Sequence, residues 1–105
     1  MPTPTDDRPE LLTVIAHAKA APGKEDDLRT ALQALVAPTV REQGCINYDM
    51  HESVDPPGLF YFYENWESPE AHDAHIQAPH LQRFVGVMDD LLDGGLTLTR
   101  LRRVA

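Results

Sequence analysis

The sequence predicts an α+β protein with a ferredoxin-like βαββαβ order, in which a four-stranded antiparallel sheet carries both helices on one face. Two observations predict this fold. Segments in which apolar residues alternate are interleaved with segments at helical spacing, in the order strand, helix, strand, strand, helix, strand. The chain of 105 residues is also long enough to bury one such core and too short for a second domain.

The first predicted strand is residues 11–20, where apolar side chains alternate up to Pro22-Gly23. A first helix follows, because three acidic residues suit the positive end of a helix dipole and apolar residues then recur at helical spacing from Leu28 to Val36. Pro38 is expected to kink or restart this helix. Gly44 lies where a left-handed C-terminal cap belongs.

The third predicted strand, residues 59–67, is joined to a second strand at 45–54 by the turn-forming run 55–58. One face of the third strand carries Phe60, Phe62, Glu64 and Trp66, and the other carries Leu59, Tyr61, Tyr63 and Asn65. Neither face is typical of a solvated surface. Helices would cover only one of them, so we expect a second copy of the chain to cover the other.

A second helix is predicted to begin after Ser68, a good N-cap, with Pro69 at its first position. Pro79 is expected to restart this helix, whose apolar face continues to Gly94-Gly95. The last predicted strand, residues 96–104, alternates Leu and Thr before it turns basic. This pattern suits a strand at a sheet edge or an interface.

The charge composition argues against nucleic acid and membranes as partners. The chain has 17 Asp and Glu residues against 9 Lys and Arg, so its formal net charge of -8 repels phosphate groups. Cys45 is the only cysteine, which excludes an internal disulfide and fits a reducing, cytoplasmic location. Residues 1–10 are rich in Pro, Thr and Asp and are expected to form a disordered arm ahead of a domain at 11–105.

Five short motifs follow one another along the chain. They are Ile15-Ala16-His17 before Pro22-Gly23-Lys24, then Val36-Ala37-Pro38-Thr39, Glu42-Gln43-Gly44-Cys45, Tyr63-Glu64-Asn65-Trp66-Glu67-Ser68, and Ala74-His75 with Ala78-Pro79-His80. In this order they resemble the antibiotic-biosynthesis monooxygenase family, most closely its small bacterial quinol monooxygenases. The resemblance implies a homodimer whose two sheets pack face to face as a dimeric α+β barrel, with a pocket between sheet and helices in each protomer.

The resemblance also implies an activity, the oxidation of a quinol or a related electron-rich aromatic by molecular oxygen without flavin, haem or metal. A deprotonated hydroquinone is itself a reductant of oxygen, so such a protein need only deprotonate, orient and enclose its substrate. Two alternatives stay open. One is an isomerase of a small signal molecule on the same scaffold, and the other is a non-catalytic dimer that binds aromatic compounds.

His75 is the first candidate catalytic residue, as a base or hydrogen-bond partner for a substrate hydroxyl. It lies among alanines that leave room for a ligand, and an imidazole titrates near neutral pH. The alternative is a half-buried histidine that only satisfies a backbone carbonyl. Glu64 is the second candidate, because a carboxylate that faces inward must be paired, protonated or directed at a ligand. We expect Glu64 to orient His75, or to pair with an arginine, rather than to transfer a proton itself.

Five residues are predicted to bind the substrate ring: Trp66, Phe62, Tyr48, Phe84 and Met88. Trp66 matches the tryptophan of the family, and either stacks on a flat ring or belongs to the core. Phe62 stands where the anthrone-oxidising members of the family carry an asparagine. This difference implies a more apolar pocket, as in the small quinol oxygenases.

Haem and metal sites are not predicted. Relative to the haem-degrading branch of the family, the first-strand asparagine falls at Ala16 and the axial histidine near Val85, so the haem ligand is missing. His72, His75 and His80 lie close in sequence, but no cysteine cluster or nearby carboxylate completes a tetrahedral set. We therefore expect these histidines on a solvated polar edge. Three polar residues of the predicted strands are left facing either the pocket or the dimer interface: His17, Asn47 and His51.

Overall fold

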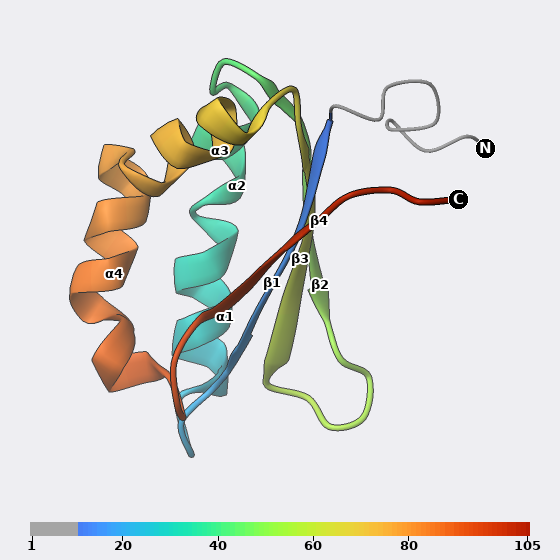
Figure 1. The fold of residues 1–105 in the computed structure, drawn as a ribbon. Coiled ribbons are helices and arrows are strands. Elements are labelled where there is room, and N and C mark those ends of the chain that lie inside the picture. The colour runs from blue at the N-terminus through green and yellow to red at the C-terminus, as the bar shows by residue number, and fades with distance from the viewer. Residues whose placement is uncertain (1–10) are drawn as a thin grey trace.

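The computed structural model describes residues 11–105 as a four-stranded antiparallel sheet with helices packed on one face (Figure 1). The strands are β1 (Leu12–Lys19), β2 (Cys45–Glu52), β3 (Leu59–Trp66) and β4 (Thr97–Leu101). The helices are α1 (Glu25–Gln33), α2 (Val36–Val40), α3 (Pro69–Ile76) and α4 (Pro79–Leu91). The strand order β2-β3-β1-β4 is ferredoxin-like, so the predicted fold class is confirmed. The expected arm at residues 1–10 lies outside the described residues.

Each of the two predicted helices is a pair of helices with a break, and the prolines explain where the pairs restart. Pro79 opens α4 after an extended residue, as predicted. The break between α1 and α2 precedes Pro38, which lies in the first turn of α2, where its missing N–H leaves no intrahelical bond unmade. Ser68 Oγ accepts the backbone N–H of Ala71 at 3.1 Å, so the predicted N-cap of α3 is confirmed. No helix within residues 11–105 has the length and apolar character needed to cross a lipid bilayer.

The covered face of the sheet forms the core. Cross-strand pairing sets Ala16 of β1 beside Phe62 of β3, and Val14 beside Glu64. Leu28 and Leu32 of α1 belong to the same buried cluster. Because side chains alternate along a strand, this register directs Phe60, Phe62, Glu64 and Trp66 toward the helices, as the sequence predicts.

The opposite face of the sheet carries no helix within the described residues (Figure 1). It presents Tyr61, which is 39% exposed, and Leu101, which is 42% exposed. A polar ladder crosses the same face: Thr13 Oγ1 donates to Asn65 Oδ1 at 2.6 Å, and Asn65 Nδ2 donates to Asn47 Oδ1 at 2.9 Å. β4 is an edge strand and all its residues are exposed, so its predicted place at an edge is confirmed. β2 and β4 both end earlier than expected, at Glu52 and Leu101.

Gly44 makes the turn that leads into β2. Its φ of +86° lies in the left-handed region that favours glycine. The C-cap of α2 is already Arg41, so Gly44 does not cap the helix directly, which corrects the expectation for this residue. A Cβ on Gly44 would lie only 2.5 Å from the Cβ of Ala71, because α3 packs directly against this turn.

The substitution Gly44→Ala is expected to destabilise the protein by about 2–5 kcal/mol. A left-handed backbone costs an alanine about 1–2 kcal/mol, and forcing a methyl group against Ala71 adds about 1–3 kcal/mol. Urea unfolding followed by circular dichroism measures this loss. Gly94→Ala is the matched control, because Gly94 has a φ of +87° but no atom within 4 Å of the added Cβ. Equal losses in both variants would contradict the close packing of α3 on this turn.

Candidate active site

A cavity lies between the covered face of the sheet and the helices. Its walls are mostly apolar, and besides Tyr48 they contain three ionisable side chains, Glu64, His72 and His75. The enclosed part measures about 20 Å³, room for about one water molecule, whereas the whole depression with its mouth open to solvent holds about 350 Å³ of empty space. Leu98 of β4 lines the cavity and is itself exposed, so it lies at the mouth. An aromatic ring can therefore enter only if side chains at this mouth move.

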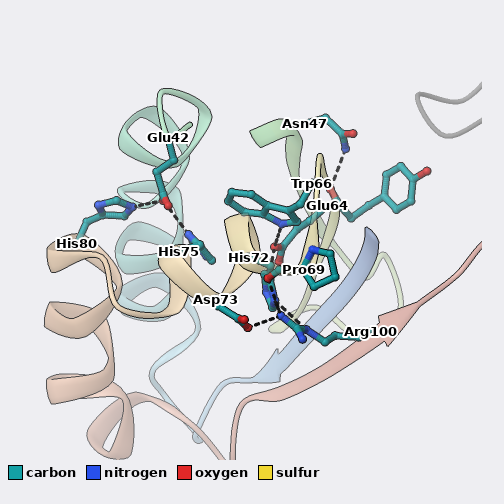
Figure 2. Close-up of polar contacts among 11 residues, drawn as sticks. Glu42, Asn47, Glu64, Trp66, Pro69, His72, Asp73, His75, His80 and Arg100 are labelled. Atoms are coloured by element: carbon teal, nitrogen blue, oxygen red, sulfur yellow. Dashed lines mark hydrogen bonds and ion pairs between the residues drawn. The ribbon is translucent and has the colours of Figure 1, made fainter. Parts of the chain in front are cut away.

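His75 projects from α3 with its ring fixed by a carboxylate. Its Nδ1 lies 2.7 Å from Oε2 of Glu42, in the turn after α2, and the residue is only 2% exposed (Figure 2). Because a carboxylate oxygen accepts, Nδ1 is the donor and Nε2 keeps its lone pair for a ligand in the cavity. Burial lowers the pKa of His75, and the hydrogen bond to Glu42 opposes that lowering. The pair is therefore a base held in place by an orienting carboxylate.

Glu64 reaches the same cavity from β3. It is 2% exposed, and its Oε1 accepts the indole N–H of Trp66 at 3.0 Å. Burial raises the pKa of Glu64 to about 7, and the Trp66 hydrogen bond limits the rise. Near neutral pH this carboxyl group is therefore able both to gain and to lose a proton.

His72 lies beside Glu64 and is held by Arg100 of β4. The Arg100 Nε and Nη2 atoms lie 3.1 and 3.0 Å from His72 Nδ1, and Arg100 also donates to the Asp73 carboxylate at 2.6 Å (Figure 2). Because arginine only donates, His72 Nδ1 accepts and Nε2 carries the hydrogen. Burial and the positive charge of Arg100 lower the pKa of His72 to about 4, so the ring is neutral.

The Nε2 atom of His72 is buried and has no hydrogen-bond partner within residues 11–105. It lies 4.0 Å from Oε1 of Glu64, too far for a direct hydrogen bond. A buried donor without a partner is costly and uncommon in folded proteins. This donor and the neighbouring acceptor, which we call the Glu64–His72 pair, are therefore suited to bind one oxygen atom of a ligand between them.

The predicted ring-binding residues divide into two groups. Tyr48, Phe62 and Phe84 line the cavity. Trp66 and Met88 are not among the residues that line it, so their contact with the ring stays a prediction. Trp66 is fully buried behind the site, with its ring centroid 4.9 Å from that of His75, and Met88 packs against the core.

The expected contact between Glu64 and His75 is wrong, since Glu64 bonds Trp66 and Glu42 takes the orienting place. The expectation of a solvated polar edge is also wrong, because His72 and His75 are buried. The sequence indicates no carboxylate near these histidines, but in the structure Glu42 lies beside His75 and His80. It belongs to one of the five motifs, but 33 residues separate it from His75, so no local spacing indicates the contact.

The three unassigned polar residues all lie on the uncovered face of the sheet. His17 is paired with Tyr61 across the sheet, and their ring centroids are 5.4 Å apart. Asn47 belongs to the polar ladder, and His51 is exposed on β2, where it pairs with Tyr61 of β3. None of the three reaches the cavity.

The fold and the enclosed polar groups define an α+β protein of ferredoxin-like topology with a site between its sheet and helices. Residues 11–87 match the family described as antibiotic biosynthesis monooxygenase, and the chain belongs to this family. It is 32% identical over 81 residues to the uncharacterized protein sll1783 of Synechocystis, a match that spans 77% of this chain and 55% of that protein.

The relatives that match over most of their length include the following two. The Mycobacterium tuberculosis protein named "Putative monooxygenase Rv0793" is 33% identical over 90 residues, which cover 86% of this chain and 88% of that protein. The structure of Rv0793 aligns with a TM-score of 0.85 at 32% identity, over 90% of this chain and 96% of the other. The Escherichia coli protein named "Probable quinol monooxygenase YgiN" is 33% identical over 94 residues, 79% of this chain and 90% of that protein.

Proposed function

We propose that this protein oxidises a quinol or a related electron-rich aromatic with molecular oxygen, without flavin, haem or metal. The observation that carries the proposal is the placement of two proton acceptors, His75 and Glu64, on one apolar cavity. His75 is oriented by Glu42 at 2.7 Å, and Glu64 has a pKa of about 7. Membership of the family and the names of Rv0793 and YgiN support the same class of reaction.

The reaction balances as quinol plus oxygen giving hydroxyquinone plus water. The quinol loses two hydroxyl protons, for which His75 Nε2 and the ionised Glu64 are the two acceptors. The electron-rich ring then transfers electrons to oxygen, and one ring carbon forms a bond to oxygen. The oxygen–oxygen bond breaks, and the hydrogen of that ring carbon leaves as a proton and becomes the hydrogen of the new hydroxyl group. The second oxygen atom takes up both protons and leaves as water. The protein supplies deprotonation, orientation and enclosure, and the substrate supplies the electrons.

The Glu64–His72 pair selects for a hydroxyl group. A substrate hydroxyl between these residues donates to the ionised Glu64 and accepts from His72 Nε2, so both buried groups are satisfied. A quinone carbonyl accepts from His72 but donates nothing to Glu64. The pair therefore holds a quinol hydroxyl more tightly than the quinone carbonyl that replaces it. The cavity opens for the ring by displacement of Leu98 on the exposed edge strand β4.

We further infer that the protein is a cytoplasmic homodimer, whose two copies pack their uncovered sheet faces together. Ile15, Tyr61, Tyr63 and Leu101 share that face, and two of them remain exposed in the single chain. Burial of such a face removes apolar surface from water. The cytoplasmic location fits the free thiol of Cys45, because thiols stay reduced in that compartment.

Oxygen consumption with a panel of reduced naphthoquinols tests the activity. The protein is tag-free and treated with EDTA, so the assay measures turnover without metal. We expect wild-type protein to exceed spontaneous autoxidation, and His75→Ala to lower the enzymatic rate by at least about 100-fold, the usual contribution of a positioned base. Asp89→Ala is the control, because Asp89 is exposed on α4, away from the uncovered sheet face, and does not line the cavity.

Absence of turnover above autoxidation with every naphthoquinol would contradict the proposed activity. Tight quinone binding without turnover would instead support a non-catalytic dimer that binds aromatic compounds. The isomerase alternative has less support, because a phosphorylated signal needs a cation and the cavity walls contain no Lys or Arg within the described residues.

A further inference from the structure

Glu42, His75 and His80 bring three metal-binding side chains to one point beside the cavity (Figure 2). Glu42 Oε2 lies 2.7 Å from His75 Nδ1 and 2.8 Å from His80 Nε2, and the three ligand atoms lie within 4.8 Å of one another. The residues come from three elements, namely the turn after α2, helix α3 and the first turn of α4. The fold therefore preassembles two imidazole nitrogens and one carboxylate oxygen.

We propose that Glu42, His75 and His80 form a binding site for one divalent transition-metal ion such as Zn²⁺. Two histidines and one carboxylate form the protein ligand set of many sites that keep a further position for water. At metal–ligand distances of about 2.0–2.1 Å, tetrahedral donor atoms lie about 3.3 Å apart. The two pairs that include Glu42 would then separate by about half an ångström, and the two histidine nitrogens, which lie within 4.8 Å of each other, would move closer together.

The surroundings of the three residues suit such an ion. The His75 ring is packed against the rings of Trp66 and Tyr48, with centroid distances of 4.9 and 5.4 Å, so its orientation is set before an ion arrives. The side chains of Glu42 and His80 are 16% and 14% exposed, so the cluster is largely buried but still in contact with solvent. His80 also lines an open groove of about 220 Å³, so one of the three ligands borders solvent.

Metal binding and the proposed oxidation would compete for His75. An ion on Nδ1 takes the place of the hydrogen now shared with Glu42, and the single hydrogen of the neutral ring then resides on Nε2. His75 could no longer accept a proton from a substrate in the cavity. This consequence rests on the proposed function, whereas the binding site itself does not.

Titration of tag-free, EDTA-treated protein with Co²⁺, followed by its visible absorption and then by displacement with Zn²⁺, tests the site. Wild-type protein is expected to bind one ion per chain, and Zn²⁺ to raise its melting temperature. Glu42→Gln and His80→Ala are expected to weaken binding by about 10-fold or more, since changes even in the outer shell of a metal site cost about 10–100-fold. Asp89→Ala, which removes an exposed carboxylate outside the cluster, is expected to bind as wild type does.

Circular dichroism shows whether the Glu42 and His80 variants fold, and the isosteric Glu42→Gln keeps the test valid if His80→Ala does not. No saturable binding in the micromolar range, or equal affinity in wild type and a folded ligand variant, would overturn the site. Zn²⁺ is also expected to inhibit quinol oxidation in wild type and not in His80→Ala. If the ion binds but no quinol is oxidised, the metal site stands and the proposed function fails; the reverse result removes only the metal site.

Discussion

Glu64→Gln is expected to lower the rate of quinol oxidation by about 100-fold or more while leaving the fold intact. Glutamine keeps an oxygen that can accept the Trp66 N–H, as Glu64 Oε1 does at 3.0 Å in wild type. It cannot accept a proton from a substrate hydroxyl. Oxygen consumption, corrected for autoxidation, measures the loss. Glu67→Gln is the matched control, because Glu67 is exposed just beyond β3. Full activity of Glu64→Gln would remove Glu64 from the mechanism.

The pH dependence gives a second measure of the same residue. Because burial raises the pKa of Glu64 to about 7, the rate catalysed by wild-type protein is expected to rise as the pH passes through about 7 and Glu64 ionises. Trp66→Phe removes a hydrogen bond that lowers this pKa, so it is expected to move the rise to higher pH. Glu64→Gln is expected to lack the rise. A pH profile that is identical in all three proteins would contradict this assignment.

Stability is expected to change in the opposite direction to activity. The pKa of Glu64 is raised from 4.5 to about 7 in the folded state, so the folded state binds the proton more tightly than the unfolded chain. The contribution of Glu64 to stability is therefore full below about pH 4.5 and is lost as the pH rises to about 7, to an extent of about 3 kcal/mol. Glu64→Gln should gain stability over wild type as the pH rises through this window. A residue with only a structural role would not combine lost activity with increased stability.

Tyr61→Asp is expected to weaken the proposed homodimer by at least about 1,000-fold. In a symmetric interface each substitution occurs twice, and loss of an aromatic anchor costs about 2 kcal/mol or more each time. The two new carboxylates would also lie on facing surfaces. Analytical ultracentrifugation over a range of concentrations measures the dissociation constant.

Val54→Asp is the matched control for Tyr61→Asp. Val54 is 99% exposed in the turn between β2 and β3, outside the uncovered sheet face, so its replacement adds the same charge without changing dimerisation. A wild-type protein that stays monomeric at micromolar concentration, or a Tyr61→Asp variant that dimerises as wild type does, would contradict the proposed interface.

The fold could be predicted because its signals are local. The alternation of apolar residues in β1 and β3, the Ser68-Pro69 start of α3 and the restart at Pro79 each depend on residues close together in the chain. The inward direction of Glu64 followed from the same alternation.

The partners of the site residues could not be predicted, because their contacts are long-range. Glu42 meets His75 across 33 residues, and Arg100 meets His72 across 28. Burial of His72 also escaped prediction, since a pattern of apolar spacing counts histidine as polar. Trp66 shows a further limit: alternation indicates that a side chain faces inward, but not whether it lines a cavity or lies behind it.

The edge strand β4 contacts three parts of the molecule: the mouth of the cavity, His72 and the proposed dimer interface. Leu98 lies at the mouth of the cavity, Arg100 decides which nitrogen of His72 bears hydrogen, and Leu101 faces the proposed partner. Contact of a second subunit with β4 would thus affect both the His72 imidazole, through Arg100, and the mouth of the cavity, through Leu98. Association of two copies would then hold Leu98 and Arg100 in the positions that they already occupy in the single chain, so dimerisation would stabilise the cavity entrance and the hydrogen placement on His72 together.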